Sequence, residues 1–146
     1  MGDYETLNEL LVKLFRDVTD AEQKMLVGPE FADITNNDMH VIEAIGIREP
    51  KNMSTIAREL SVTVGTLTIA MNSLVKKGYV ERTRGQEDRR VVYISLSERG
   101  KKAYESHEKF HREMIQSMIE KLSQEEVETL VKALSSLSLW FSSRQI

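Results

Sequence analysis

The spacing of apolar residues changes from a helical to a strand-like period at Gly78, and this change limits the folds open to the chain. Before it, Leu67, Met71 and Leu74 recur at intervals of three or four residues, which places them on one face of a helix. After it, the stretches 79–84 and 90–96 are β-branched and aromatic with rough alternation. We therefore predict a helix that Gly78 ends as a C′ glycine and that leads directly into a β-hairpin.

A second short helix precedes this one. Residues 54–60 carry Ile56, Ala57 and Leu60 on one face, and a tight turn at 61–62 separates them from the next helix, which Thr63 caps. Residues 48–52 are expected to form a loop. Two short helices joined by a few residues make a helix-turn-helix, and the hairpin that follows makes it a winged helix-turn-helix.

Longer helices flank this region, and nothing in them breaks the helical period. Apolar stripes predict helices over 3–25, from a Thr35 cap to about residue 47, over 97–122, and from a capping box at 123–126 to about residue 141. The fold class is therefore mainly α with a small β-hairpin wing. We expect residues 1–34 to form an N-terminal helix and loop, residues 35–100 the winged helix-turn-helix domain, and residues 101–146 the C-terminal helices.

Composition excludes several classes of protein. The 146 residues suit one main core, and the absence of cysteine rules out a disulfide framework and a thiolate zinc site. No apolar run approaches the ~18–20 residues of a membrane span, so we expect a cytoplasmic protein. Phosphate loops, nucleophile elbows and HExxH motifs are missing, so we expect no enzyme and no cofactor.

The charge is distributed unevenly, although the net charge is only −3. Residues 48–102 hold 12 basic and 6 acidic side chains, whereas residues 1–47 hold 3 and 10. This asymmetry indicates one basic surface on an acidic body, as a nucleic-acid binder needs.

The helix after Thr63 has an outer face suited to DNA. No carboxylate occurs between Thr63 and Lys77, so the helix can approach phosphates without repulsion. Small residues would let its N-terminus enter a major groove, and Asn72 has the groups to pair with adenine N6 and N7. The candidate DNA-binding residues of this helix are Thr63, Gly65, Thr66, Thr68, Ile69, Asn72 and Lys76.

The tip of the hairpin supplies arginines. Arginine suits the negative potential of a narrow minor groove, and a nearby carboxylate can hold one arginine in a bidentate pair and aim it. The candidate residues here are Arg82, Arg84, Asp88, Arg89 and Arg90.

Residues 53–100 resemble the DNA-binding core of MarR-family regulators. The matching features are Ile56-Ala57, the Ser/Thr-rich start of the second helix, Leu74-x-x-x-Gly78-Tyr79-Val80, Asp88-Arg89-Arg90 and Leu96-Ser97-x-x-Gly100. The resemblance implies an obligate homodimer with intertwined terminal helices that binds a pseudopalindromic operator. It also implies that Asp88 orients an arginine and that Arg90 enters the minor groove.

Several shorter motifs are similar to the FabT-type branch of the family. They are Asp33-Ile34, Met39-His40, Ile45-Gly46, Thr63-Val64-Gly65-Thr66, Arg82-Thr83-Arg84, Asp88-Arg89-Arg90-Val91-Val92 and Phe110-His111. This similarity implies repression of fatty-acid-synthesis genes, with a long acyl chain on acyl carrier protein as co-repressor.

The sequence is compatible with two kinds of effector, an acyl chain or a metal ion. Methionine adapts to flexible ligands, so an acyl pocket could be lined by Met39, His40, Phe110, His111 and Met114, which could equally be ordinary core residues. Zinc-sensing members of the family are similar in placing histidines on the second and fifth helices, where this chain has His40, His107 and His111. His107 and His111 share a helix face, and Glu22 or Glu108 could complete a zinc site if His40 folds close by. No metal ligand is assigned on this ground.

A rival of another class is a helical adaptor that binds protein rather than DNA. The basic middle segment and the acid-free helix argue against it.

Overall fold

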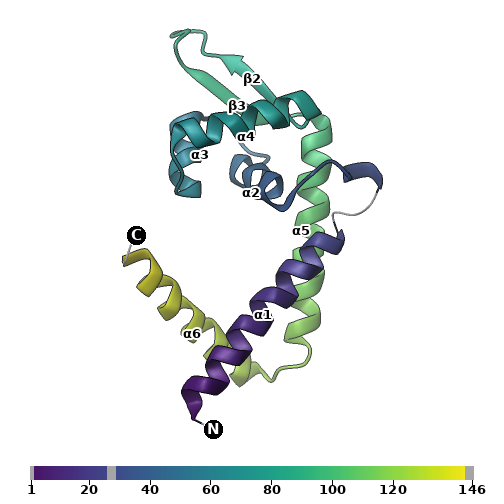
Figure 1. Ribbon diagram of the computed structural model, residues 1–146, viewed down its shortest axis with the longest axis vertical. Coiled ribbons are helices and arrows are strands. Elements are labelled where there is room, and N and C mark those ends of the chain that lie inside the picture. The colour runs from purple at the N-terminus through teal and green to yellow at the C-terminus, as the bar shows by residue number, and fades with distance from the viewer. Residues whose placement is uncertain (1, 26–28, 144–146) are drawn as a thin grey trace. The chain divides into compact units, whose positions relative to one another are not determined.

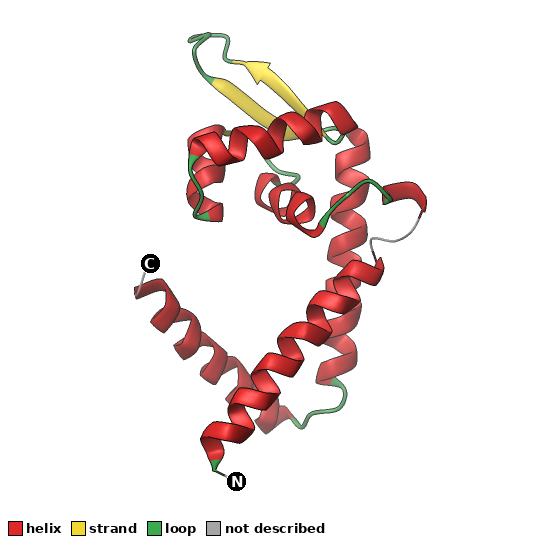
Figure 2. Ribbon diagram, viewed as in Figure 1, coloured by secondary structure: helices red, strands yellow, loops and turns green. Residues whose placement is uncertain are grey.

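The computed structural model describes residues 2–25 and 29–143. These residues form two compact units, and the boundary between them lies between Glu108 and Lys109, inside one helix. Figure 1 labels the six α-helices and the strands β2 and β3, and Figure 2 separates helices from strands. In chain order they are α1 (Asp3–Met25), the 3-10 helix η1 (Pro29–Phe31), α2 (Asn36–Ile45), β1 (Lys51–Asn52), α3 (Met53–Leu60), α4 (Val64–Lys77), β2 (Val80–Arg84), β3 (Val92–Leu96), α5 (Glu98–Ile119) and α6 (Gln124–Ser143).

Local sequence signals set the ends of α2. The Thr35 hydroxyl accepts from the Asp38 backbone amide at 3.0 Å, and the Asp38 carboxylate accepts from the Thr35 amide at 3.1 Å, which makes a reciprocal capping box. Gly46, at φ +70°, ends the helix close to its predicted end near residue 47.

The helix-turn-helix is formed as predicted by α3 and α4. Ser61 adopts the left-handed conformation that turns the chain between them, and Thr63 caps α4 by accepting from the Thr66 amide at 3.1 Å. Gly78 ends α4 at φ +86°, a conformation that a side chain would strain. The hairpin follows immediately, and these elements lie together in Figure 1.

The wing is part of a three-stranded antiparallel sheet of order β1-β3-β2. In the hairpin Val80 lies opposite Leu96 and Arg84 opposite Val92, close to the predicted limits. The prediction of a loop over 48–52 was wrong at its end, because Lys51 and Asn52 pair with Ile94 and Tyr93. Two residues are too few to carry an alternation signal, so only the partner strand defines β1.

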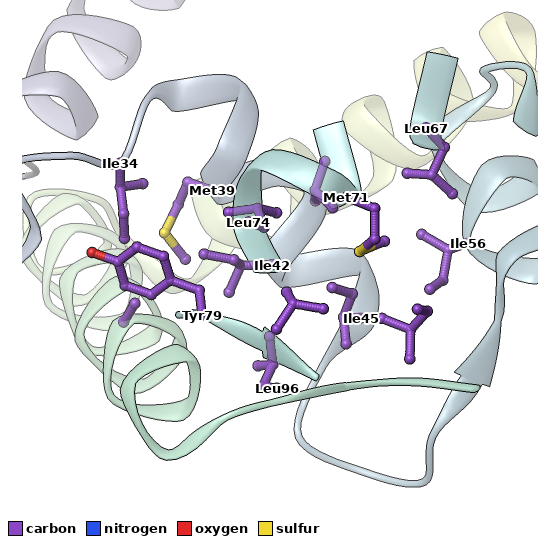
Figure 3. Close-up of a cluster of buried hydrophobic side chains, with 14 of the residues drawn as sticks. Ile34, Met39, Ile42, Ile45, Ile56, Leu67, Met71, Leu74, Tyr79 and Leu96 are labelled. Atoms are coloured by element: carbon purple, nitrogen blue, oxygen red, sulfur yellow. The ribbon is translucent and has the colours of Figure 1, made fainter. Parts of the chain in front are cut away.

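The core of the first unit joins α2, α3, α4 and the sheet, as Figure 3 shows. The predicted inner face of α4, Leu67, Met71 and Leu74, is fully buried, so the opposite face must be exposed. Tyr79 is also fully buried, at the junction of α4 and β2.

Gly100 permits a close approach between the start of α5 and the backbone of Tyr79. A Cβ at this position would lie 2.0 Å from the Tyr79 carbonyl oxygen. Ser97 donates its amide to that same oxygen at 3.0 Å and caps α5 by accepting from the Gly100 amide at 3.1 Å. The Ser97-x-x-Gly100 motif therefore docks the start of α5 on the connection between α4 and β2.

The long helices carry apolar side chains that the single chain does not cover. None of the described residues of α1 is buried, and Leu7, Leu10, Leu11, Leu14 and Phe15 are exposed. In the second unit, α6 begins with the predicted capping box of Ser123 and Glu126 and exposes Leu134, Leu137, Trp140 and Phe141. No described helix is long and apolar enough to span a bilayer.

Candidate nucleic-acid interface

The outer face of α4 is open to solvent. Ile69 is 74% exposed although it is a large aliphatic residue, and Gly65, Thr66, Asn72 and Lys76 are exposed around it. Thr68 is half-buried beside them. A helix with small, polar and basic groups on the side opposite its core can enter a groove of DNA.

Hydroxyl groups near the start of α4 already donate hydrogen bonds to other groups of the helix. Thr63 donates to the Thr66 hydroxyl at 3.0 Å, and Thr68 donates to the Val64 carbonyl at 2.8 Å. Thr68 therefore has its methyl group and oxygen lone pairs left for a base, but no free proton.

Asn72 and Arg82 connect α4 to the wing. Arg82 Nη2 donates to Asn72 Oδ1, and both side chains are exposed. Sequence reasoning assigned these residues to separate contacts, Asn72 to bases and Arg82 to the wing surface. No local sequence pattern predicts this pairing, because ten positions separate Asn72 from Arg82.

Asp88 holds Arg90 at the tip of the wing. Arg90 donates through Nε to Asp88 Oδ1 and through Nη2 to Oδ2, both at 3.1 Å, and its backbone amide donates to Oδ1 at 3.0 Å. The side-chain hydrogen bond from Arg90, followed by the backbone bond, lowers the pKa of Asp88. The expected bidentate pair is thus present, and Arg90 retains a side chain that is 92% exposed.

The two remaining wing arginines are also near the turn. Arg84 Nη1 donates to the Arg89 carbonyl at 3.1 Å, while Gly85 and Val91 close the turn by a backbone hydrogen bond of 2.8 Å. Arg89 is exposed. The hairpin tip therefore holds several guanidinium groups within a few residues.

A cluster that sequence reasoning missed fixes the base of the wing. Arg99 lies 4.3 Å from the centroid of the Tyr79 ring, donates to the Lys77 carbonyl at 2.6 Å and pairs with Asp33 at 3.3 Å. The Tyr79 hydroxyl donates to Asp33 as well. This hydrogen bond is the main reason that the pKa of Asp33 is lowered, while burial and then the Asp33 contact raise the pKa of Tyr79.

A second contact anchors the last turn of α4 on α2. Lys77 Nζ lies 2.8 Å from the Asp38 carboxylate, whose side chain is only 8% exposed. Asp38, which closes the capping box of α2, therefore also holds the end of α4.

Comparison with known proteins decides the family. The model of the MarR family matches residues 34–92, from the end of the η1–α2 connection into β3. The crystal structure of Streptococcus pneumoniae FabT in complex with DNA superposes with a TM-score of 0.92 at 37% identity, covering 97% of this chain and 99% of that one. This chain belongs to the MarR family.

Curated members of the family from Bacillus subtilis agree. The transcriptional regulator PchR is 27% identical over 121 residues, covering 80% of this chain and 72% of PchR, and the regulator YfiV is 32% identical over 107 residues, covering 73% and 66%. Other relatives are matched over about half of their length. The chain is thus a DNA-binding transcriptional regulator of the MarR family, and its relatives are not enzymes.

The residues predicted for an effector pocket lie in different surroundings in this MarR-family chain. Met39 is buried in the core of the first unit, whereas His40 is exposed and lines a cavity of about 240 Å³ between α2, α3 and α4. Phe110, His111 and Met114 are half-buried in the second unit, where the rings of Phe110 and His111 meet edge-on with centroids 5.5 Å apart.

His107, one of the candidate zinc ligands, is buried among carboxylates. Its Nδ1 lies 2.5 Å from Glu43 and its Nε2 lies 3.7 Å from Glu22. Burial lowers the pKa of His107, but the hydrogen bond and charge of Glu43 and the charge of Glu22 outweigh it and raise the pKa overall. Sequence reasoning considered Glu22 and missed Glu43, which lies on α2, far from α5 in the chain.

Proposed function

We propose that this chain is a repressor that binds a pseudopalindromic operator as a homodimer. The observation that carries the proposal is the exposed, acid-free face of α4 beside an arginine-tipped wing. The high similarity to a protein solved in complex with DNA supports it. A repressor of this kind acts in the cytoplasm of a bacterium, where the chromosome lies.

The two parts of the interface have different tasks. We assign base contacts in the major groove to the face of α4 that runs from Thr63 to Asn72, and a phosphate contact to Lys76 near its end. Arg90, held by Asp88, enters the minor groove, and Arg84 and Arg89 contact phosphates. The assigned residues are Thr63, Gly65, Thr66, Thr68, Ile69, Asn72 and Lys76 on α4 and its cap, and Arg82, Arg84, Asp88, Arg89 and Arg90 in the wing.

Dimerisation would cover the apolar faces of the long helices. Phe15 on α1 is 78% exposed and Phe141 on α6 is 68% exposed in the single chain, each within a row of further apolar residues. Contiguous apolar patches of this kind mark an interface. Residues 1–34 and 101–146 form the dimerisation region in this proposal, and residues 35–100 form the DNA-binding domain.

The regulated genes are proposed to be those of fatty-acid synthesis, with acyl carrier protein bearing a long acyl chain as co-repressor. The similarity to FabT supports this assignment. Native mass spectrometry of the purified protein tests it, and a retained acyl species is the expected result. In a DNA-binding assay, addition of acyl carrier protein with its acyl chain should make binding tighter. Retained zinc would instead favour a zinc-responsive regulator.

Salt dependence tests DNA binding itself. We expect the affinity for a mixed-sequence duplex, measured by fluorescence anisotropy, to fall steeply with salt, with a slope of about −0.9 per phosphate neutralised. Lys76→Ala removes one such contact from each subunit and should make the slope shallower by about 1.8. Lys132→Ala on α6 is the matched control and should keep the wild-type slope. A flat response in the wild type would contradict the proposal and favour a helical adaptor.

A further inference from the structure

The hydrogen bond between Arg82 and Asn72 bears on which base the recognition helix selects. It joins β2 to the outer face of α4, on the surface to which the proposed function assigns DNA contacts. Resting on that proposed function, we propose that Arg82 turns Asn72 into a donor-only reader of bases. The pair then selects guanine over adenine at one position of each half-site.

The chemistry of the two side chains fixes the orientation of the amide. A guanidinium group only donates, whereas an asparagine amide has one accepting oxygen and one donating nitrogen. Turning the amide over would set its N–H groups against those of Arg82. The oxygen of Asn72 therefore faces Arg82, and the nitrogen is the group left for a base.

The charge of Arg82 is also available to a base. Among the described residues, no carboxylate lies within ion-pair distance of Arg82. Its neighbour on the same strand, Arg84, donates instead to the Arg89 carbonyl. The unused N–H groups of Arg82 thus lie beside the Asn72 amide, and both groups present donors.

The base edges in the major groove distinguish such a pair from a free asparagine. Adenine presents the acceptor N7 next to the donor N6, and a free asparagine matches both. Guanine presents two acceptors, N7 and O6, and matches a surface that only donates. An adenine amino group that approached the second lone pair of Asn72 Oδ1 would meet the N–H groups of Arg82. The pair therefore favours guanine, and removal of Arg82 restores the adenine preference of Asn72.

Selection from a pool of duplexes with a randomised central segment tests the proposal. Purified full-length protein is used, and the bound duplexes are sequenced. Asn72→Ala identifies the position that Asn72 reads, because discrimination is lost there. At that position the wild type should prefer guanine, and Arg82→Met should shift the guanine-to-adenine ratio toward adenine by about fivefold to a hundredfold.

Arg84→Met is the matched control because it removes an exposed arginine from the same strand without touching Asn72. It should weaken binding to all sequences and leave the base preference unchanged. Thermal unfolding of each variant checks that the fold is retained.

Two different failures can be told apart. If the wild type enriches a motif that carries adenine at the Asn72 position, or if Arg82→Met enriches the same motif as the wild type, the donor-only proposal is wrong while the regulator remains sequence-specific. If no motif is enriched by the wild type, the proposed function itself fails.

Discussion

Asp88 accepts hydrogen bonds from the Arg90 side chain through both carboxylate oxygens at the tip of the wing, yet the side chain of Arg90 remains 92% exposed. The carboxylate therefore restricts the rotamers of Arg90 without covering it. A side chain that is already ordered loses less entropy when it enters a groove. The wing thus presents a pre-oriented cation rather than a freely moving one.

Replacing this arginine should weaken DNA binding without unfolding the protein. A charge-assisted hydrogen bond contributes about 1.5–3 kcal/mol, so Arg90→Ala should lower operator affinity by about tenfold to a hundredfold. Anisotropy with a selected operator measures the loss. Arg48→Ala, which removes an exposed arginine from the loop before β1, should leave affinity nearly unchanged. Equal affinities of Arg90→Ala and wild type would refute the groove role.

Asp38 has two structural tasks, and its loss should cost more than the loss of a cap alone. It closes the capping box of α2 and pairs with Lys77 from a nearly buried position. We expect Asp38→Ala to lower the free energy of unfolding by about 2–3 kcal/mol, since both the cap and the charge-assisted hydrogen bond from the half-buried Lys77 are lost. Glu126→Ala, which breaks the exposed capping box of α6, should cost clearly less, because no ion pair is lost with it. Urea unfolding compares the two, and similar losses would show that the Lys77 contact contributes nothing.

The Asp33 carboxylate should make the stability of the folded protein depend on pH. Its pKa is lowered in the folded protein, first by the Tyr79 hydroxyl and then by the charge of Arg99. The contribution of Asp33 to stability is therefore present at pH values above its ordinary pKa of 3.8, and it is lost as the pH falls through the lowered pKa of the folded state. Asp33→Asn keeps an oxygen for Tyr79 but removes the charge. The stability difference between wild type and Asp33→Asn, measured by urea unfolding, should be largest near neutral pH and shrink toward acid. A constant difference across pH would mean that the charge of Asp33 is not involved.

The apolar stripe of α1 offers a test of dimerisation. Leu14→Glu places a charge in the centre of that stripe, so the dimer should dissociate because burial of an unpaired carboxylate is costly. Arg16→Glu is the control, since it changes the charge on the opposite side of the same helix. Analytical ultracentrifugation measures the mass of each variant, and DNA binding should be lost with the dimer. If Leu14→Glu remained dimeric, α1 would not form the interface.

Elements with a repeating pattern or a capping signal were predictable from the chain alone. Thr35, Thr63 and Gly78 mark helix ends through bonds to residues three or four positions away, and the buried face of α4 follows from its period. The pair of Asp88 and Arg90 is likewise local, because two positions separate them. Such features need no knowledge of the rest of the fold.

Contacts between distant segments could not be predicted in this way. Lys51 becomes a strand residue only because Ile94 lies beside it, and His107 meets Glu43 only because α5 packs near α2. The pairing of Arg82 with Asn72 depends on the angle at which the hairpin leaves Gly78.

The sequence by itself determined the winged helix-turn-helix, the family and the open face of the recognition helix, because these depend on periodicity, caps and composition. Tertiary structure alone decided which polar side chains meet: Arg99 with Tyr79 and Asp33, Lys77 with Asp38, and Arg82 with Asn72. The physical reason is that a hydrogen bond or ion pair requires atoms within a few ångströms, and for residues far apart in the chain that proximity arises only when the core packs.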